Sequence, residues 1–296
     1  MIQRALVLAL TLLALAPATR AGSRVCGDDV DGRGTVVPCS CGDLLVSSRT
    51  LSADDPITQE TCTGPGLLVG VPTGRTAPTL ALGGRTITGS GHGAGLLVAS
   101  GGDGGLTLLG PGTVRGFASG IVASPGALTR AADVVSTENR GDGFDLGGTG
   151  YAVTGCEATR NGRDGFALRG RGFHVEDNQA RENQRYGFSI AGRDAVIGGA
   201  LGNQAIGNGR DGLAIRGRDS VVERPVATAN GRSGLRARIA RGRISGAQAS
   251  ANRGAGVQAG GSDVVVSDSD ASGNGGPPVR LRGTRQRSCG PVDECR

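Results

Sequence analysis

The chain has 296 residues, of which 56 are glycine against a typical share of about 7%, so composition alone fits a low-complexity chain and only a repeat can establish a fold. Aromatic residues make up 2% of the chain and tryptophan is absent, which argues against a wide core built on bulky rings. The 32 basic residues, all of them arginine, and the 26 acidic residues give a formal net charge of +6, and no apolar stretch reaches the roughly 18 residues of a membrane span.

The N-terminus has the pattern of a secretory signal peptide. Residues 1–4 carry one positive charge, residues 5–16 are almost wholly apolar, and the small residue Ala21 follows. We therefore expect residues 1–21 to be a signal peptide that is cleaved near Ala21. The sequence predicts a secreted protein, periplasmic or extracellular, without a transmembrane anchor.

Seven cysteines in an exported chain favour disulfides. The candidates lie toward the two ends of the chain: Cys26, Cys39, Cys41, Cys62, Cys289 and Cys295. Two N-terminal bridges and one C-terminal bridge are the simplest arrangement, and the four N-terminal cysteines leave three connectivities open. A metal site at Cys39 and Cys41 is the weaker alternative because no histidine lies near them. Cys156 stands alone, and we expect it to be a buried thiol. These clusters predict an N-terminal cap at 22–63 and a C-terminal cap at 285–296.

An asparagine recurs through the second half of the chain at intervals of 22, 22, 25, 22, 22 and 22 residues. The recurring residues are Asn139, Asn161, Asn183, Asn208, Asn230, Asn252 and Asn274. Positions below are counted from this asparagine. Glycine stands at Asn+4 in the first six units, and apolar residues stand at Asn+5 and Asn+7 in all seven. A spacing of two residues places both apolar side chains on one face of a strand.

Two further columns keep the same period. β-Branched residues occupy Asn+14: Val153, Val175, Ile197, Val222, Ile244 and Val266. Small residues, from Ser136 to Ala271, lie three positions before each asparagine. The longer interval contains three extra residues between Ile197 and Ala205, which we expect to form an outward loop. Each unit thus has three short strands that cannot bury their apolar sides alone, so the units must stack about 4.8 Å apart.

Stacking of this kind predicts an all-β fold, a parallel β-helix of about ten coils of about 22 residues over residues 64–284. Asparagine at the turn can take left-handed backbone angles and can hydrogen-bond to the asparagines of neighbouring coils, forming a ladder. Two rival repeats fit poorly. Leucine-rich repeats need more leucines per unit, and calcium-binding nonapeptide repeats would give periods of nine or eighteen.

The unit sequences Asn-Gly-Arg-Asp-Gly-Phe-Ala-Leu at 161–168 and Asn-Gly-Arg-Asp-Gly-Leu-Ala-Ile at 208–215 resemble the right-handed parallel β-helix repeats of the pectin-lyase-like superfamily. Residues 80–91 resemble the first-coil signature of exported bacterial members. The resemblance implies a right-handed solenoid. It does not imply one activity, since the superfamily includes lyases, hydrolases, epimerases and proteins without known catalysis.

Motifs of the catalytic relatives are incomplete in this chain. Gly91-His92-Gly93 matches one segment of the polygalacturonases, but this chain has neither their Asn-Thr-Asp segment nor any lysine. The Asp pair Asp54-Asp55 precedes the coils and is typical of a surface turn. We therefore expect His92 to be a turn residue.

The alginate epimerases carry Tyr-Gly-Phe-Asp-Pro-His, whereas Tyr186-Gly187-Phe188 continues here as Ser189-Ile190, without the acid–base half. Alternation along its strand points the remaining histidine, His174, outward. We predict no catalytic residue.

Arginine recurs at Asn+2, as Arg163, Arg185, Arg210 and Arg232, which we call the arginine stripe. Repeat duplication can produce such a stripe as a solvated edge. Alternatively, its guanidinium groups could bind the carboxylates or sulfates of an acidic polysaccharide in a bidentate manner. Asp142, Asp164 and Asp211 at Asn+3 could bind calcium as in pectate lyases, but aspartates in polar turns are usually turn formers. We predict no cofactor.

We therefore expect an exported, monomeric β-helix protein, non-catalytic, with a structural or acidic-glycan-binding role and no nucleic-acid partner. The alternative is a lyase or epimerase acting on uronic-acid polysaccharides. A third possibility, an accessory factor like the β-helix proteins of nitrous oxide reductase assembly, rests on analogy of fold.

Overall fold

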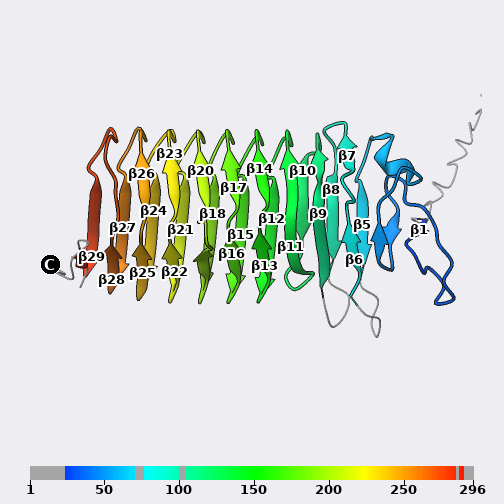
Figure 1. Ribbon diagram of the computed structural model, residues 1–296, viewed down its shortest axis with the longest axis horizontal. Helices are drawn as coiled ribbons and strands as arrows, with labels where there is room; N and C mark the ends of the chain where they lie inside the picture. Colours follow the sequence, from blue (N-terminus) through cyan, green and yellow to red (C-terminus); the bar gives the residue numbers. More distant parts are fainter. Residues whose placement is uncertain (1–23, 71–76, 100–104, 285–286, 290–296) are drawn as a thin grey trace, which may run out of the picture.

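The computed structural model describes residues 24–70, 77–99, 105–284 and 287–289, and the chain is an all-β, right-handed parallel solenoid, as the sequence predicts. Its coils stack along the long axis of the molecule (Figure 1). The described ranges hold one 3₁₀ turn, Pro56–Thr58, and no helix that could span a membrane. The predicted signal peptide and Cys295 lie outside the described residues, as does most of the predicted C-terminal cap.

One wall of the solenoid is a parallel sheet, with twelve strands in the described part of the chain, which we call the long sheet. Its strands, in order, are β1 (Val25–Cys26), β2 (Leu44–Leu45), β5 (Leu67–Gly70), β8 (Ala94–Ala99), β10 (Ser119–Ala123), β12 (Phe144–Thr149), β15 (Phe166–Arg171), β18 (Phe188–Arg193), β21 (Leu213–Arg218), β24 (Leu235–Ala240), β27 (Val257–Ser262) and β29 (Val279–Thr284). The Asn+5 residues lie in register and face inward. Phe144, Phe166 and Phe188 stack with ring centroids 4.7 and 4.8 Å apart.

The other two walls are built from shorter strands. The early coils contribute β3 (Arg49–Thr50), β4 (Thr61–Cys62), β6 (Thr79–Ala81), β7 (Thr86–Gly89) and the long strands β9 (Leu106–Arg115) and β11 (Leu128–Thr137). The second wall continues through β13 (Ala152–Thr154), β16 (His174–Glu176), β19 (Val196–Gly198), β22 (Val221–Glu223), β25 (Gly242–Ser245), β28 (Val264–Ser267) and β30 (Arg287–Cys289). The third wall continues through β14 (Glu157–Thr159), β17 (Gln179–Arg181), β20 (Gln204–Ile206), β23 (Val226–Thr228) and β26 (Gln248–Ser250).

The β-branched column at Asn+14 is aligned as predicted. Val153 pairs with Val175, Val175 with Ile197, and the register continues without a shift to Val266. All six side chains are at most 1% exposed. The repeat therefore becomes a continuous apolar stripe inside the solenoid, and its burial is the main force that holds the coils together.

The asparagine ladder is also confirmed. The Asn161 amide nitrogen donates to Asn183 Oδ1 and to the backbone oxygen of Ser136, both at 3.0 Å, and Asn161 Oδ1 accepts the backbone and side-chain N–H groups of Asn139. The same pattern repeats through Asn274. Six of the seven asparagines are at most 2% exposed, so the ladder supplies partners to buried polar groups that would otherwise lack them.

We expected the left-handed backbone angle at the asparagine, but the structure places it one residue earlier. Glu138, Arg160, Glu182, Ala229 and Ala251 have φ between 53° and 57°. The asparagine amide must point into the coil to reach its neighbours, so the preceding residue makes the corner instead. Each non-glycine residue in this region costs about 1–2 kcal/mol, which the stacked coils offset.

A second, shorter ladder lies at the next corner and was not predicted. Asn178 donates to Asn203 Oδ1 at 3.0 Å, and the backbone N–H of Cys156 donates to Asn178 Oδ1 at 2.9 Å. Cys156 is a free, buried cysteine, as predicted. Burial raises the pKa of its thiol to about 12, so it is not a nucleophile at neutral pH.

The three-residue insertion forms the predicted outward loop. Ala200 and Leu201 are exposed, Leu201 to 74%. The Asp177 carboxylate accepts the backbone N–H groups of Ala200, Leu201 and Gly202 at 2.8–3.3 Å. One carboxylate of the preceding coil thus holds the loop in place.

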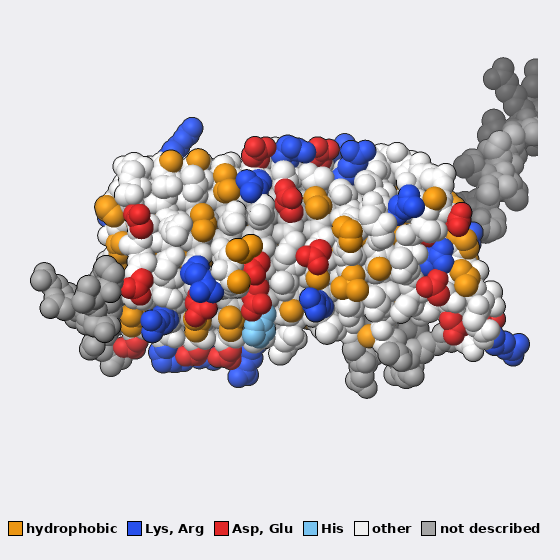
Figure 2. Space-filling view, in the orientation of Figure 1, with side chains coloured by type: hydrophobic (Ala, Val, Ile, Leu, Met, Phe, Trp, Pro, Cys, Tyr) orange, Lys and Arg blue, Asp and Glu red, His pale blue; other side chains and the backbone are white. Residues whose placement is uncertain are grey.

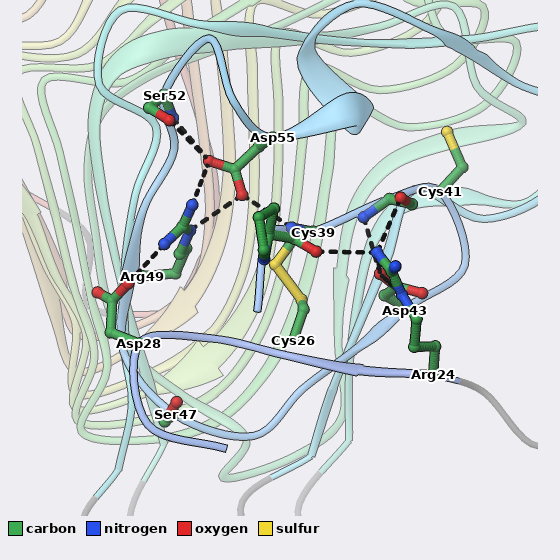
Figure 3. Close-up of a disulfide and its surroundings, with 12 residues drawn as sticks. Arg24, Cys26, Asp28, Cys39, Cys41, Asp43, Ser47, Arg49, Ser52 and Asp55 are labelled. Carbon is green, nitrogen blue, oxygen red and sulfur yellow. Dashed lines mark hydrogen bonds and ion pairs between the residues drawn. A yellow bond between two sulfur atoms is a disulfide. The ribbon is translucent and has the colours of Figure 1, made fainter. Parts of the chain in front are cut away.

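Two disulfides close the N-terminal region: Cys26–Cys39, which Figure 3 shows, and Cys41–Cys62. Both sulfurs of the proposed metal pair are therefore in disulfides, which rules out that alternative. The parallel pairing extends into the segment 22–63, because β2, β3 and β4 pair with β5, β6 and β7 of the following coil. The Cys289 and Cys295 side chains lie outside the described residues, so the C-terminal bridge stays a prediction.

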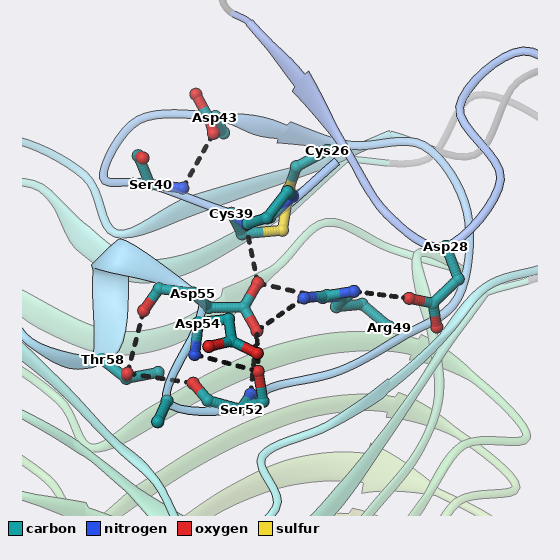
Figure 4. A network of polar contacts seen from close by, with 12 residues as sticks. Cys26, Asp28, Cys39, Ser40, Asp43, Arg49, Ser52, Asp54, Asp55 and Thr58 are labelled. Carbon is teal, nitrogen blue, oxygen red and sulfur yellow. Dashed lines mark hydrogen bonds and ion pairs between the residues drawn. A yellow bond between two sulfur atoms is a disulfide. The ribbon is translucent and has the colours of Figure 1, made fainter. Parts of the chain in front are cut away.

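The expectation of a surface turn at Asp54-Asp55 is wrong for Asp55, which is fully buried, while Asp54 is exposed. Arg49 binds Asp55 with Nε and Nη2, at 2.9 and 2.8 Å, and its Nη1 lies 2.7 Å from Asp28 (Figure 4). Burial alone would raise the pKa of Asp55, but hydrogen bonds from Arg49 and from the backbone N–H groups of Cys39 and Ser52 outweigh it and lower that pKa. Asp55 therefore ties the cap together as a carboxylate.

Candidate functional site

Acidic and metal-ligating side chains do not converge in the described part of the chain, which contains no group of three or more His, Cys, Asp or Glu residues suited to a metal. Asp142 and Asp164 are buried, and each accepts a backbone N–H of the following coil, at 2.9 and 3.3 Å. Tyr186 occupies the coil between Asp164 and Asp211. The three aspartates at Asn+3 thus hold neighbouring coils together rather than facing one ion.

The surroundings of Asp164 change the acidity of its carboxyl group. Burial raises its pKa and nearby Asp142 adds to the rise, while the hydrogen bond from the Tyr186 backbone and the charges of Arg185 and Arg163 lower it. The balance is a raised pKa. A raised pKa is found at many catalytic carboxylates, but here the side chain is bound to backbone and enclosed.

The backbone of the arginine stripe is aligned from coil to coil, as predicted. The N–H groups of Arg185, Arg210 and Arg232 each donate to the carbonyl of the preceding stripe residue at 2.8–3.1 Å. The guanidinium carbons of Arg185 and Arg210 each lie 5.6 Å from the ring centroid of Tyr186, one cation–π contact each. Arg163 lies 3.8 Å from Asp142 and Arg185 lies 3.5 Å from Asp164. Three of the four guanidinium groups are therefore engaged with their own chain.

A hollow lies at the C-terminal ends of the strands of the long sheet, whereas the arginine stripe lies just before their N-terminal ends. One cavity of about 610 Å³ is lined by Asp145, Arg169, Arg171, Arg193 and neighbouring small residues. A second cavity of about 490 Å³ shares Gly170 and Arg193 with it and continues to Arg218 and Ala240. We call this continuous hollow, with Arg169, Arg171, Arg193 and Arg218 along it, the basic groove.

The floor of the basic groove is a column of glycines at Asn+9. Gly148, Gly170 and Gly217 have φ of 139°, 144° and 150°, which side chains rarely allow. A Cβ on Gly170 would lie 1.7 Å from the Gly148 carbonyl oxygen, and one on Gly217 would lie 1.6 Å from that of Gly192. The absence of Cβ atoms lets the backbones of successive coils pack closely here, and the backbone of these glycines lines the hollow.

The arginines of the groove are regularly spaced. Arg171, Arg193 and Arg218 are register partners in β15, β18 and β21, so their Cα atoms are about 4.8 Å apart. Arg171 pairs with Asp194 at 2.8 Å, and Arg218 lies 3.9 Å from Asp219. Arg193 is exposed and forms no ion pair with any described residue. It is the cation most available to a ligand.

Sequence reasoning missed this groove, although a signal was present. The triplet Arg-Gly-Arg occurs at 169–171 and 216–218, and Ala-Gly-Arg at 191–193, each at Asn+8 to Asn+10. The regular apolar columns at Asn+5 and Asn+7 end just before these triplets. That these glycines and arginines line one hollow becomes visible only in three dimensions.

The two histidines lie apart from both arginine sites. His92 is exposed in the turn before β8, and His174 is exposed on β16, 3.5 Å from Glu176, as expected for both. On the face drawn in Figure 2, acidic and basic side chains are interspersed, and neither sign forms a large block. The shape of the groove therefore marks the candidate site better than charge alone.

No family model matches the chain, and no curated protein sequence matches it. Among solved structures, the A-module of mannuronan C-5 epimerase AlgE4 from Azotobacter vinelandii is 23% identical, with 79% of this chain and 69% of that one covered and a TM-score of 0.48. The Dettilon tailspike protein gp208 is 12% identical over 82% of this chain and 62% of its own, with a TM-score of 0.48. The AlgE6 A-module from the same bacterium is 18% identical over 84% and 87%, with a TM-score of 0.41. These similarities concern fold alone.

Proposed function

We propose that this protein is an exported, non-catalytic β-helix protein that binds an acidic polysaccharide along the basic groove. The observation that carries the proposal is the file of Arg171, Arg193 and Arg218 in successive coils above a floor of glycines. A linear polymer with regularly repeated carboxylates or sulfates presents its charges as a similar file. Each guanidinium can then form a bidentate contact with one anionic group.

The lining of the groove favours acidic over neutral glycans. Its described residues include no aromatic ring on which a sugar could stack, so binding must depend on charge and hydrogen bonds. The four arginines are accompanied in the lining by one carboxylate, that of Asp145, which lies 2.9 Å from Arg169. Outside the lining, Asp194 pairs with Arg171 and Asp219 lies 3.9 Å from Arg218, so Arg193 is the positive charge of the groove that remains without an ion pair to a described residue.

The same lining supports a non-catalytic role. A lyase or epimerase must remove a proton next to a carboxylate, which requires a base within hydrogen-bond reach. No histidine or tyrosine is among the described residues that line the groove, and Asp145 is already in an ion pair. The enzyme alternative predicts unsaturated ends or epimerised residues after incubation with polyuronates. We expect neither product.

Export is supported by two observations from different parts of the chain. The first 21 residues have the pattern of a signal peptide, and two disulfides close the N-terminal region, which is typical of an oxidising compartment. N-terminal sequencing of the protein recovered outside the cytoplasm would then begin near residue 22.

The binding proposal is tested by fluorescence anisotropy with a labelled oligouronate and a neutral oligoglucan of equal length. Arg193→Ala should weaken oligouronate binding about fivefold, on the order of 1 kcal/mol for one exposed contact. Arg232→Ala is the matched control, since it removes an exposed stripe arginine that forms no ion pair with any described residue. Binding should weaken as salt rises from 50 to 300 mM, because ions screen exposed charges.

Two results would contradict the proposal that the acidic polymer binds in the basic groove. Equal affinity for the neutral and acidic probes would remove the role of charge. A loss of binding in Arg185→Ala combined with Arg210→Ala, without a loss in Arg193→Ala, would favour the arginine stripe as the site instead.

A further inference from the structure

Arginines on the outer face of the long sheet change position from coil to coil. Three outward files run along the sheet, at Asn+6, Asn+8 and Asn+10. In β15, β18 and β21 the Asn+10 file holds Arg171, Arg193 and Arg218. Arginine also occupies the other two files, as Arg169, Arg216, Arg238 and Arg282 at Asn+8 and, from β24 onward, as Arg236 and Arg280 at Asn+6. The Asn+10 arginines end at β21 and the Asn+6 arginines begin at β24, so the basic side chains shift from the C-terminal ends of the strands toward their N-terminal halves.

The straight continuation of the groove loses its positive charge. After Arg218 the Asn+10 file continues with Ala240, followed in the next strands by Ser262 and Thr284. A polyanion that ran on along this file would leave every arginine of the last coils unused.

Resting on the proposed function, we propose that the acidic polymer leaves the groove near Arg218 and crosses the long sheet obliquely, past Arg216 and Arg238, to Arg236 and Arg280. From Arg193 to Arg280 the route covers four coils and four positions along the strand, about 19 Å by 13 Å. The polymer would therefore lie about 35° from the long axis of the solenoid. This route places arginine beneath the ligand in β18, β21, β24 and β29, while β27 contributes Gln258 between Arg236 and Arg280.

A small cavity lies on this route. It has a volume of about 50 Å³ and is lined by Arg236, Arg238, Gln258, Gly260 and Arg282. Gly260 interrupts the Asn+8 file, so a gap of one side chain opens between Arg238 and Arg282. The Arg238 side chain is exposed, and Arg236 lies 2.8 Å from the buried Asp211, which fixes its guanidinium. The cavity offers an anionic group of the polymer contact with more than one guanidinium.

The shape of the surface and the positions of the arginines favour different routes for the polymer, which makes the proposal testable. The cavity of about 490 Å³ extends straight on to Ala240, whereas the arginines turn toward Gln258. Gln258 lies between Arg236 and Arg280 in register, and Ala240 follows Arg218. Both positions are half-exposed and point outward. Placing one carboxylate at either position therefore changes the net charge equally.

The test compares Gln258→Glu with Ala240→Glu in the anisotropy assay, using a labelled oligouronate of at least ten residues. The oblique route predicts a loss of affinity of fivefold or more for Gln258→Glu and less than twofold for Ala240→Glu. The arginine variants should have the opposite effect on affinity. Gln258→Arg should bind the oligouronate more tightly than wild type does, and Ala240→Arg should bind it with unchanged affinity. Thermal unfolding of each variant shows whether the fold is intact.

The outcomes separate the two proposals. If wild type does not bind the oligouronate, the proposed function fails and the route falls with it. If wild type binds through Arg193, but Ala240→Glu is the variant that loses affinity, the groove stands and the oblique route is wrong.

Discussion

At the residue scale, several side chains that look suited to chemistry serve the backbone instead. The carboxylates of Asp142, Asp164 and Asp211 each accept a backbone N–H of the next coil. Asp55 accepts two backbone N–H groups and two guanidinium N–H groups while fully buried. Parallel coils expose backbone donors at every turn, and a short carboxylate is the nearest group that can satisfy them.

Asp55 yields a prediction about stability and its dependence on pH. Asp55→Asn leaves the buried Arg49 without its main counter-ion and should lower the free energy of unfolding at pH 7 by about 3 kcal/mol. Since the folded-state pKa of Asp55 is lowered, its contribution is complete above the unfolded pKa of about 3.9 and is lost as pH falls through the folded value.

The difference between wild type and Asp55→Asn should therefore shrink as the pH falls below about 4. Urea unfolding at several pH values, with disulfides intact, measures it. Asp54→Asn is the control and should change stability by less than about 0.5 kcal/mol, since that side chain is exposed. A similar loss in both variants, or a difference independent of pH, would contradict the role assigned to Asp55.

At the element scale, the walls and corners could be predicted to different degrees. The inward columns were predictable because a 22-residue period fixes which side chains lie above one another, as the alignment of Val153, Val175 and Ile197 shows. The corner angle was misplaced by one residue, since the repeated letter is the asparagine while the left-handed residue before it varies in type. The ladder of Asn178 and Asn203 escaped notice because two asparagines do not make a period.

Cooperation along the main ladder gives a second prediction. Asn183→Ala in the middle removes hydrogen bonds to Asn161, Asn208 and the backbone of Ala158, and leaves their buried groups unpaired. We expect a loss of about 2–4 kcal/mol, more than one unsatisfied group costs. Asn274→Ala at the half-buried end of the ladder should cost about half as much. Thermal or urea unfolding of the two variants compares them, and equal losses would show that the ladder acts as independent pairs.

At the scale of the whole molecule, the repeat predicted the solenoid but not its candidate site. About ten coils were expected, and the long sheet has twelve strands in the described ranges because β1 and β2 of the segment 22–63 join it. The basic groove is lined by the backbone of Gly170 and Gly217 and by the arginines that flank them, and this lining does not follow from spacing alone. The disulfide pairing likewise required the chain path, since three connectivities fit the sequence.

The most direct measurement is a crystal structure of the protein with a bound oligouronate. The account predicts the polymer over the glycine floor, with its carboxylates within about 3 Å of the guanidinium groups of Arg171, Arg193 and Arg218. A polymer bound along Arg163 and Arg185 at the opposite edge of the sheet, with the groove empty, would contradict it.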